Sequence, residues 1–295
     1  MNICFCIDRG ALAGLHVTLH GVFHYLGAPS CTVYLLHSGL SGQDFKELEM
    51  TVGQSRYSGK FEIVPKEIEL SMFESFSSHF GQGWMAYARL LAPDLLCCER
   101  LLYLDADLLV YADLSELYSV SLHGSVLGAA TWFDAKRSND RTFYEANGFD
   151  LSKPYFNSGV LVLDCEMWRR QDWTKRCLEF GRKHNKNLPT VDQTILNVLM
   201  GGEFFQIARR FNTPVSAGRN RLDLSDLEDR IIHLVSRPKP WDPIGQLNGQ
   251  YDYYSAVMAK TAIAGFQPRR LSLRDFRNYR HWFKCWKNIP QFWSR

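Results

Sequence analysis

The sequence predicts an α/β fold organised around a doubly wound, parallel sheet. Two patterns carry this prediction. Short apolar strands alternate with amphipathic helices through residues 2–64, and several later strands are continuous apolar runs, which is typical of strands covered on both faces. The chain of 295 residues is 46% hydrophobic and 22% charged, so it has the length and composition for a sizeable globular core.

The N-terminal elements follow from local signals in order along the chain. Leu15, Leu19 and Val22 recur at helical spacing, and Ser41 is a suitable N-cap for a second helix. The expected elements are strands at residues 2–7, 31–36 and 61–64 and helices at residues 15–26 and 43–52.

The later elements alternate less regularly. Asp164 is a suitable cap for a helix that extends to about Lys183, and a shorter helix begins near Asp192. Capping of this shorter helix is the alternative, or an addition, to a functional role for Asp192. The expected strands are residues 101–104, 126–131, 155–163 and 231–235, and the expected helices are residues 84–91, 165–183, 191–200 and 251–264.

The segment from Arg100 to Val110, RLLYLDADLLV, is the strongest functional signal. Asp105 and Asp107 follow an apolar strand and, with alternating side-chain directions, point the same way, with Ala106 opposite. Two carboxylates at the end of a buried strand need a compensating charge, and oxygen ligands suit Mg²⁺ or Mn²⁺, which complete their shells with substrate phosphates. The pattern indicates a metal–diphosphate site; the alternative is an Asp-rich turn.

Other polar residues stand at or near strand ends. Asp8 follows the first strand, and His233 lies in the strand at residues 231–235. Because open α/β sheets bind ligands at the carboxyl ends of their strands, we expect both residues near Asp105 and Asp107. His233 is a candidate third metal ligand through its neutral imidazole, and the alternative is a structural histidine beside an apolar strand.

Cysteine usage and the N-terminus bear on the compartment. The eight cysteines form no C-x-x-C pair, so buried reduced thiols are expected. No apolar run reaches the roughly 18–20 residues that span a bilayer, and the N-terminus MNICFCIDRG lacks the basic region of a signal peptide. These features predict a cytoplasmic protein.

Residues 266–295 differ from residues 1–265 in charge and composition. They carry eight basic residues and one acidic residue, a net charge of +7, which leaves −4 for the remainder because the total is +3. Eight aromatic residues are interleaved, and this mixture suits the interface of an anionic membrane. We expect one α/β domain followed by a membrane-docking extension. The alternatives are that the aromatics pack on the body or that the extension binds nucleic acid, which the acidic body disfavours.

Five ordered segments resemble glycosyltransferase family 8. They are MAYARL at 85–90, LLYLDADLLV at 101–110, YFNSGVLVL at 155–163, VDQTILN at 191–197 and HLVSRPKPW at 233–241. The likeness is greatest to bacterial lipopolysaccharide and lipooligosaccharide galactosyl- or glucosyltransferases and extends from Met1 to about Trp241. It implies a GT-A fold, a Rossmann-like nucleotide-diphospho-sugar transferase with a mixed, mostly parallel sheet. It also implies UDP-hexose donors, Mn²⁺ and retention of anomeric configuration.

The same resemblance implies roles for individual residues. The implied ligands of Mn²⁺, or alternatively Mg²⁺, are Asp105, Asp107 and His233. The implied contacts to the donor nucleotide, with Asp8 at the uracil and Lys239 at phosphate, are Asp8, Arg89, Asp105, Ala106 and Lys239. The implied catalytic residues around the transferred sugar are Asp192, Gln193, Arg89 and Asn157.

Retention needs either a covalent carboxylate intermediate or attack from the face that the phosphate leaves. Gln193 has no anionic oxygen and is a poor nucleophile, and Asp192 usually holds sugar hydroxyls in the family. We favour same-face attack, in which the departing phosphate takes the acceptor proton. A metal ion with Lys239 and Arg89 stabilises charge on the leaving phosphate, and Asp192 offsets oxocarbenium character on the sugar.

Three departures from the family pattern bear on the substrates. Arg9 follows Asp8 where the family has an acidic residue or Asn, and Ser236-Arg237 stands where Gly-Pro is common. Trp132 occupies the position of an Asp in related enzymes, and an indole there suits stacking on a sugar face. These differences concern the hexose and acceptor more than the reaction class.

We therefore predict a retaining transferase that moves a hexose, with glucose or galactose favoured, from a UDP-sugar to a saccharide acceptor. The predicted acceptor belongs to lipopolysaccharide or another cell-surface glycan. Docking of the extension on the inner face of the plasma membrane would suit a lipid-linked acceptor. The alternatives are a catalytically silent UDP-sugar-binding protein and a nucleotidyltransferase, which lacks the support of a Gly-rich triphosphate loop.

Overall fold

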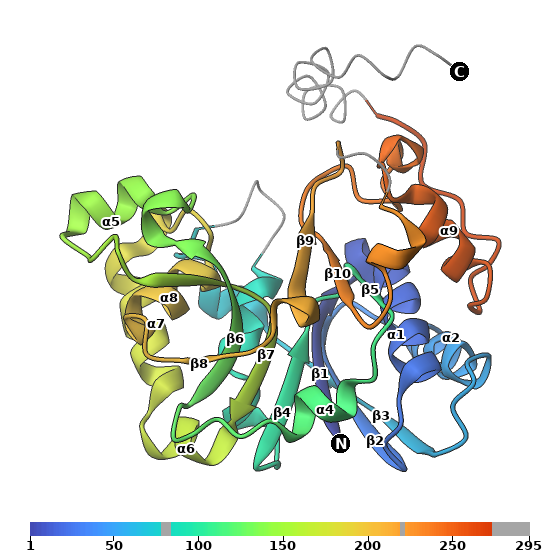
Figure 1. The fold of residues 1–295 in the computed structure, drawn as a ribbon, viewed down its shortest axis with the longest axis horizontal. Helices are drawn as coiled ribbons and strands as arrows, with labels where there is room; N and C mark the ends of the chain where they lie inside the picture. The colour runs from blue at the N-terminus through green and yellow to red at the C-terminus, as the bar shows by residue number, and fades with distance from the viewer. Residues whose placement is uncertain (78–83, 219–221, 273–295) are drawn as a thin grey trace.

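The computed structural model describes residues 1–77, 84–218 and 222–272. Two sheets organise the chain (Figure 1). The strands are β1 (Asn2–Asp8), β2 (Ser30–Ser38), β3 (Lys60–Glu67), β4 (Arg100–Leu104), β5 (Leu108–Val110), β6 (Leu127–Asp134), β7 (Pro154–Asp164), β8 (Phe205–Gln206), β9 (Thr213–Val215) and β10 (Ile231–Leu234).

The large sheet has the order β3-β2-β1-β4-β7-β6-β8. Neighbouring strands from β3 to β4 are parallel, β7 is antiparallel to both β4 and β6, and β8 is parallel to β6. A small sheet, β5-β10-β9, continues from the end of β4. The predicted α/β fold with a mixed, mostly parallel central sheet is confirmed.

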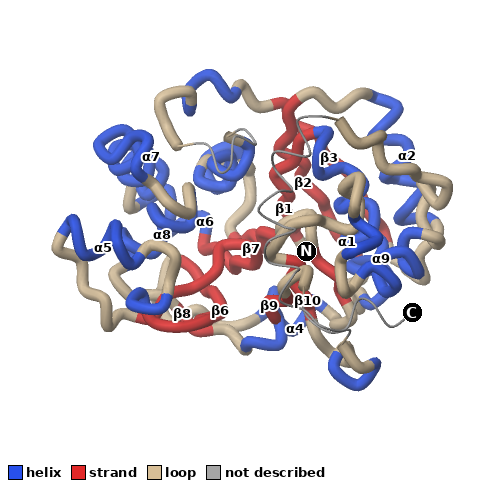
Figure 2. Tube along the Cα trace, turned by 90° about the horizontal axis from the view of Figure 1, so that it is seen from above, coloured by secondary structure: helices blue, strands red, loops and turns tan. Residues whose placement is uncertain are grey.

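Helices cover both faces of the large sheet. The α-helices are α1 (Leu12–Tyr25), α2 (Gly42–Gly53), α3 (Ala92–Leu95), α4 (Leu114–Ser119), α5 (Arg141–Asn147), α6 (Cys165–Arg170), α7 (Trp173–His184), α8 (Asp192–Met200) and α9 (Tyr251–Met258). Figure 2 shows α5, α7 and α8 on one side of the strands and α1, α2 and α9 on the other.

The apolar strands supply both faces of the core. In β4, Leu101 and Tyr103 pack into the cluster beneath α6, α7 and α8, whereas Leu102 and Leu104 pack into the cluster beneath α1 and α2. Successive side chains of a strand point to opposite faces, so a strand that is covered twice must be apolar throughout. This requirement explains the continuous apolar run that leads to Asp105.

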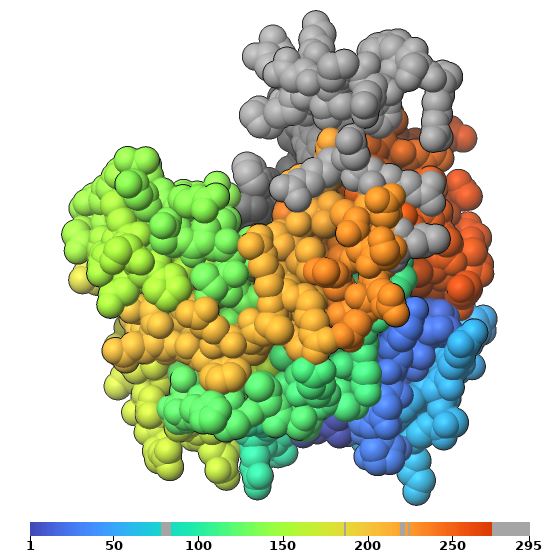
Figure 3. All heavy atoms as spheres, in the orientation of Figure 1, coloured from blue at the N-terminus to red at the C-terminus, as the bar shows by residue number. Residues whose placement is uncertain are grey.

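A third, smaller cluster joins the C-terminal elements to the body. It combines Val17 of α1 and Leu109 of β5 with Ile232 of β10 and Tyr254 of α9. Figure 3 shows the C-terminal part of the described chain, orange to red, lying directly against the green and blue surfaces of the earlier chain. Phe266 also packs against this cluster, and the rest of the predicted extension from residue 273 onward lies outside the described residues.

Three predicted helices differ from the observed ones. Residues 85–90 form a 3₁₀ helix rather than an α-helix. The helix expected over 165–183 is two helices, because Asp172 adopts a left-handed φ of 54° between α6 and α7. The helix expected over 251–264 ends at Met258, after which Thr261 donates its hydroxyl to the Met258 carbonyl within a turn.

The described residues can be compared with the expectations about cysteines and membrane-spanning segments. No disulfide joins the seven cysteines found there, and five of them are buried. No helix in those ranges combines the length and apolarity that crossing a bilayer requires.

His16 on α1 makes the stability of the fold dependent on pH. Its side chain is fully buried, and Nδ1 lies 2.7 Å from Thr51 Oγ1. Burial lowers the pKa of His16 to about 4, against the smaller opposing effects of Glu47 and Asp44. As the pH falls, His16 therefore takes up a proton in the unfolded chain before it does so in the folded protein. The contribution of neutral His16 to the free energy of unfolding is fully present above about pH 6.5 and is lost as the pH falls toward 4.

We expect the free energy of unfolding to fall by about 2 kcal/mol through this single group between neutral pH and about pH 5. His16→Gln removes the titrating group and should flatten the pH dependence by that amount, measured by urea denaturation across the range. His123→Gln, at an exposed position, is the matched control. An unchanged slope in His16→Gln would contradict the assignment.

Candidate active site

Asp105 and Asp107 lie where the chain passes from the large sheet to the small one. The Asp105 N–H donates to the Gly159 carbonyl of β7 at 2.8 Å, and the Leu234 N–H of β10 donates to the Asp107 carbonyl at 3.0 Å. Both carboxylates therefore project from a backbone held at both ends. The Ala106 side chain between them packs into the core beneath α1.

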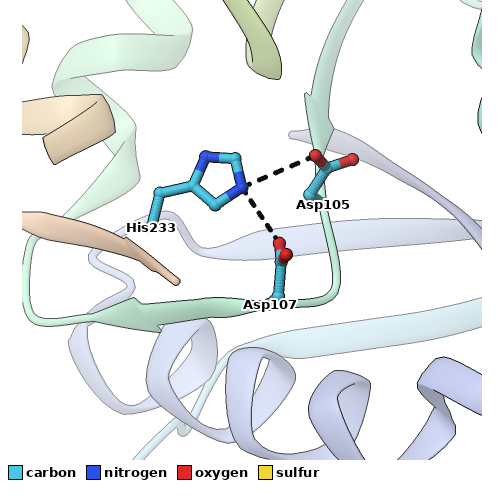
Figure 4. A group of neighbouring side chains, drawn as sticks. All are labelled: Asp105, Asp107 and His233. Carbon is cyan, nitrogen blue, oxygen red and sulfur yellow. Dashed lines mark ion pairs between the residues drawn. The ribbon is translucent and has the colours of Figure 1, made fainter. Parts of the chain in front are cut away.

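His233 on β10 completes a cluster of three possible metal ligands. Its Nε2 lies 3.1 Å from Asp107 Oδ1 and 3.7 Å from Asp105 Oδ2 (Figure 4). One ligand atom from each side chain lies within 4.8 Å of the other two. The prediction that His233 lies beside the two aspartates is thus confirmed.

Two observations fit a divalent cation. Asp107 Oδ1 is buried and accepts no hydrogen bond from the described residues, although His233 Nε2 lies within ion-pair distance. Gly159 leaves space on the other side, because a Cβ there would collide with His233 Cε1 and lie 2.7 Å from Asp105 Oδ2. Two carboxylates with one imidazole form a donor set that suits Mn²⁺, and Mg²⁺ less well.

Lys239 stands at the edge of this cluster. Its ammonium donates to Asp107 Oδ2 at 2.6 Å and to the Leu234 carbonyl. Burial acts to raise the pKa of Asp107, but Lys239 and His233 outweigh it and hold that pKa well below its usual range. Asp107 is therefore ionised at neutral pH, as a metal ligand must be.

Arg89 joins the aspartate cluster to the start of α8. The 3₁₀ helix at Met85–Leu90 directs its guanidinium inward, where only 6% of the residue is exposed. Nη2 lies 3.0 Å from Asp105 Oδ1, and Nε lies 3.1 Å from Asp192 Oδ2. Nη1 donates to the Ser158 carbonyl and hydroxyl. Burial would lower the pKa of Arg89, but the two carboxylates raise it overall.

Asp192 is the first residue of α8, and Val191 occupies the cap position. The alternative role of Asp192 as the cap of its helix is not observed, because Val191 holds the cap position and the Asp192 carboxylate faces Arg89 and Ser158. Oδ2 accepts from Ser158 Oγ at 2.9 Å and pairs with Arg89. Burial raises the pKa of Asp192 to about 6, although Arg89 acts to lower it.

Asn157 and Gln193 are in direct contact. Asn157 Nδ2 donates to Gln193 Oε1 at 2.8 Å, and the Ser158 N–H donates to the same oxygen at 3.1 Å. Gln193 Nε2 in turn donates to Tyr155 Oη at 3.1 Å. Both lone pairs of the Gln193 carbonyl oxygen are therefore occupied, and only the NH₂ group of Gln193 can make further hydrogen bonds, as a donor.

Two further predicted residues lie on β1 and β6 of the large sheet. Asp8 closes β1, and its Oδ1 accepts from the Gly10 N–H at 2.9 Å. Trp132 on β6 is half-buried, with Nε1 donating to the Asn212 carbonyl at 3.0 Å and its ring 5.9 Å from that of His233. Arg9, the residue that departs from the family pattern, forms an ion pair with Asp44 at 2.8 Å.

Comparison with known proteins identifies the family. The model of "Glycosyl transferase family 8" matches residues 2–245. The chain belongs to this family. It is a glycosyltransferase family, and the metal-ligand cluster and strand-end residues above fall inside the matched range.

Two relatives show how far along the chain the likeness extends. The lipopolysaccharide 1,2-glucosyltransferase of Escherichia coli K12 is 31% identical over 293 residues, covering 95% of this chain and 85% of that protein. Glycosyltransferase GlyF of Streptococcus pneumoniae is 26% identical over 246 residues, and the match spans 57% of its length.

A solved structure shows the same fold. The galactosyltransferase LgtC, determined in complex with donor and acceptor sugar analogs, superimposes with a TM-score of 0.71 at 21% identity, covering 94% of this chain and 99% of LgtC. The GT-A fold predicted from the resemblance to family 8 is thereby confirmed.

The structure adds polar residues that sequence reasoning did not single out. Ser158 lies inside the YFNSG segment and holds both Arg89 and Asp192. Tyr103 donates its hydroxyl to Asp105 Oδ1 at 2.7 Å and lies beneath the Arg89 guanidinium. Asn212, before β9, contacts His233 Nδ1 at 3.0 Å. Ser158 and Tyr103 fall within recognised segments, whereas no local pattern marks Asn212.

We expect Gly159→Ala to weaken cation binding by about tenfold or more, because the added Cβ displaces two ligands at once. Mn²⁺ binding, measured by titration with electron paramagnetic resonance, reports this directly. Gly128→Ala in β6 is the matched control, since its Cβ meets the flexible end of Leu122. Equal Mn²⁺ affinity in the two variants would show that the space at Gly159 is not needed for the cation.

Proposed function

We propose that this protein is a retaining hexosyltransferase that moves a hexose from a UDP-sugar to a saccharide acceptor. The observation that carries the proposal is the cluster of Asp105, Asp107 and His233 at the sheet edge, with Lys239 and Arg89 against it. Family membership supports glycosyl transfer, and the cluster supports a donor whose phosphates bind through a metal ion.

Asp105, Asp107 and His233 are the residues that would hold Mn²⁺, with Mg²⁺ as the alternative. A bound cation supplies Lewis-acid stabilisation of negative charge on a diphosphate. Lys239 places a second positive charge beside the proposed metal position. Its flexible ammonium, which donates to Asp107 Oδ2, reaches the region where negative charge develops on the leaving diphosphate.

Arg89 acts chiefly by positioning its neighbours. It donates hydrogen bonds to Asp105, to Ser158 twice and to the Ala86 carbonyl, so most of its donors are already engaged within the protein. Its buried charge balances Asp105 and Asp192 at the same time. This arrangement fixes a metal ligand and a sugar-facing carboxylate relative to one another.

Same-face attack fits the residues around the expected sugar position. The Gln193 carbonyl oxygen already accepts two hydrogen bonds, so it is not available as a nucleophile. Asp192 is paired with Arg89 and Ser158, which suits electrostatic stabilisation of a developing oxocarbenium ion better than bond formation. The departing phosphate is then the group that takes the acceptor proton.

Glucose and galactose are the favoured hexoses, and the acceptor is a saccharide of lipopolysaccharide or another cell-surface glycan. The names of two relatives, a lipopolysaccharide 1,2-glucosyltransferase and a galactosyltransferase, support this choice. Trp132 supports a saccharide acceptor, because an indole anchored through Nε1 offers its face to a sugar ring.

The reaction class is tested by UDP release from a panel of UDP-sugars with Mn²⁺ and no acceptor. One sugar should release UDP, and Asp107→Ala should lower that rate by about 100-fold or more because a ligand and its charge are lost. Asp150→Ala, in an exposed turn, is the matched control. Tight UDP binding without release, even with saccharide acceptors present, would instead indicate a silent donor-binding protein.

The basic extension is proposed to dock the enzyme on the inner face of the plasma membrane, near a lipid-linked acceptor. Deleting residues 267–295 removes eight basic residues. We expect cosedimentation with phosphatidylglycerol vesicles to fall by roughly tenfold or more, since each basic residue near an anionic surface contributes to attraction. Phosphatidylcholine vesicles provide the control, and unchanged sedimentation of the shortened protein would contradict membrane docking.

A further inference from the structure

Asn212 is a fully buried polar residue behind the metal-ligand cluster. It ends the 3₁₀ helix at Arg209–Asn212 and precedes β9, and none of its surface is exposed. Oδ1 lies 3.0 Å from His233 Nδ1, and Nδ2 donates to Asn157 Oδ1 at 2.9 Å. Its own carbonyl accepts from Trp132 Nε1. One side chain thus connects β10 with β7.

Main-chain donors determine which way the neighbouring amides face. The Gly159 N–H donates to Asn157 Oδ1 at 2.9 Å, and the Ser158 N–H donates to Gln193 Oε1. A backbone N–H cannot reverse its role, so each of these side-chain oxygens is fixed in place. The amide of Asn157 therefore presents its oxygen to Asn212.

The orientation of Asn212 follows from that of Asn157. Because Asn157 Oδ1 is an acceptor, Asn212 must face it with its NH₂ group, and this turns Asn212 Oδ1 toward His233. An amide oxygen accepts only, so His233 Nδ1 must carry a proton to satisfy the contact. Nε2 is then the ring nitrogen directed at Asp105 and Asp107.

We propose that Asn212 is a positioning residue that keeps His233 protonated at Nδ1 and directs Nε2 to the cation. The proposal rests on the metal site of the proposed function. Histidine ligands need a partner on the second nitrogen to fix ring orientation, and in this chain the partner is a neutral amide whose own direction is set by β7.

The hydrogen bonds continue in the same direction beyond Asn157. Asn157 donates to Gln193, Gln193 donates to Tyr155, and Tyr155 donates to Asp140 Oδ2 at 2.7 Å. Asp140 is fully buried and also accepts from Thr190. Along this path each amide accepts one hydrogen bond and donates the next. The path ends at the carboxylate of Asp140, which lies 93 positions before His233 in the sequence.

The test compares Mn²⁺ affinity in Asn212→Ala, Asn212→Asp and Asn197→Ala. Asn197 is the matched control, because it is also buried and bonds the backbone of β7 at Phe156 without contacting His233. Asn212→Ala should weaken Mn²⁺ binding by about 10–100-fold. Asn197→Ala should leave Mn²⁺ affinity within about twofold, although it too removes buried hydrogen bonds.

Asn212→Asp separates positioning from a merely structural role. The carboxylate still accepts from His233 Nδ1, so Mn²⁺ affinity should stay within about threefold of wild type. It also places an oxygen against Asn157 Oδ1, and stability should fall. If Asn212 only supported the fold, Asn212→Asp would lose Mn²⁺ affinity at least as fully as Asn212→Ala.

A spectroscopic measurement tests the proton directly. With ¹⁵N-labelled histidine and Mg²⁺, wild type should show a slowly exchanging Nδ1–H signal that is absent from His233→Gln. Asn212→Asp should keep the slow exchange, and Asn212→Ala should lose it. An unprotonated Nδ1 in wild type, or wild-type Mn²⁺ affinity in Asn212→Ala, would overturn the inference about Asn212 and leave the metal site in place. A wild-type protein that binds no Mn²⁺ overturns the metal site itself.

Discussion

Compensation of buried negative charge at the end of β4 is the constraint on which the site depends. Asp192 is buried and Asp105 and Asp107 are partly buried, so each carboxylate would be costly if left unpaired. Arg89 compensates Asp105 and Asp192, and Lys239 compensates Asp107. The positions of the 3₁₀ helix, of α8 and of the loop after β10 are all tied to these contacts.

The backbone path makes this clustering possible. The chain leaves the large sheet after Leu104 and enters the small sheet at Leu108, so two carboxylates stand on the connection between two hydrogen-bonded strands. β10 brings His233 opposite Leu108 in the same small sheet. Gly159 on β7 leaves the volume that the three side chains need. The ligands are therefore placed by sheet register and by one absent side chain, rather than by a flexible loop.

The sequence predicted the strand, its two carboxylates and His233 because each leaves a local signal: an apolar run, a D-x-D pattern and a polar residue in a strand. It failed where the outcome depends on distant contacts or on a backbone conformation that leaves no pattern in the sequence. The direction of the Asp192 carboxylate is set by Arg89 and Ser158, and the break at Asp172 is a local backbone conformation that the apolar spacing does not encode. Asn212 is an ordinary Asn in sequence, and only the packing of β10 against β7 gives it a role.

Charge also explains why a neutral residue holds His233. The three carboxylates and two cations of the site leave one net negative charge, which a divalent ion reverses and a diphosphate restores. A carboxylate in place of Asn212 would still accept from Nδ1, but it would add a buried negative charge close to the position proposed for the donor phosphates. The Asn212 amide orients the His233 ring without adding charge. The main-chain N–H of Gly159 fixes the orientation of this amide through Asn157. The electrostatic balance of the site and the orientation of the His233 ring are thus set by separate groups of residues.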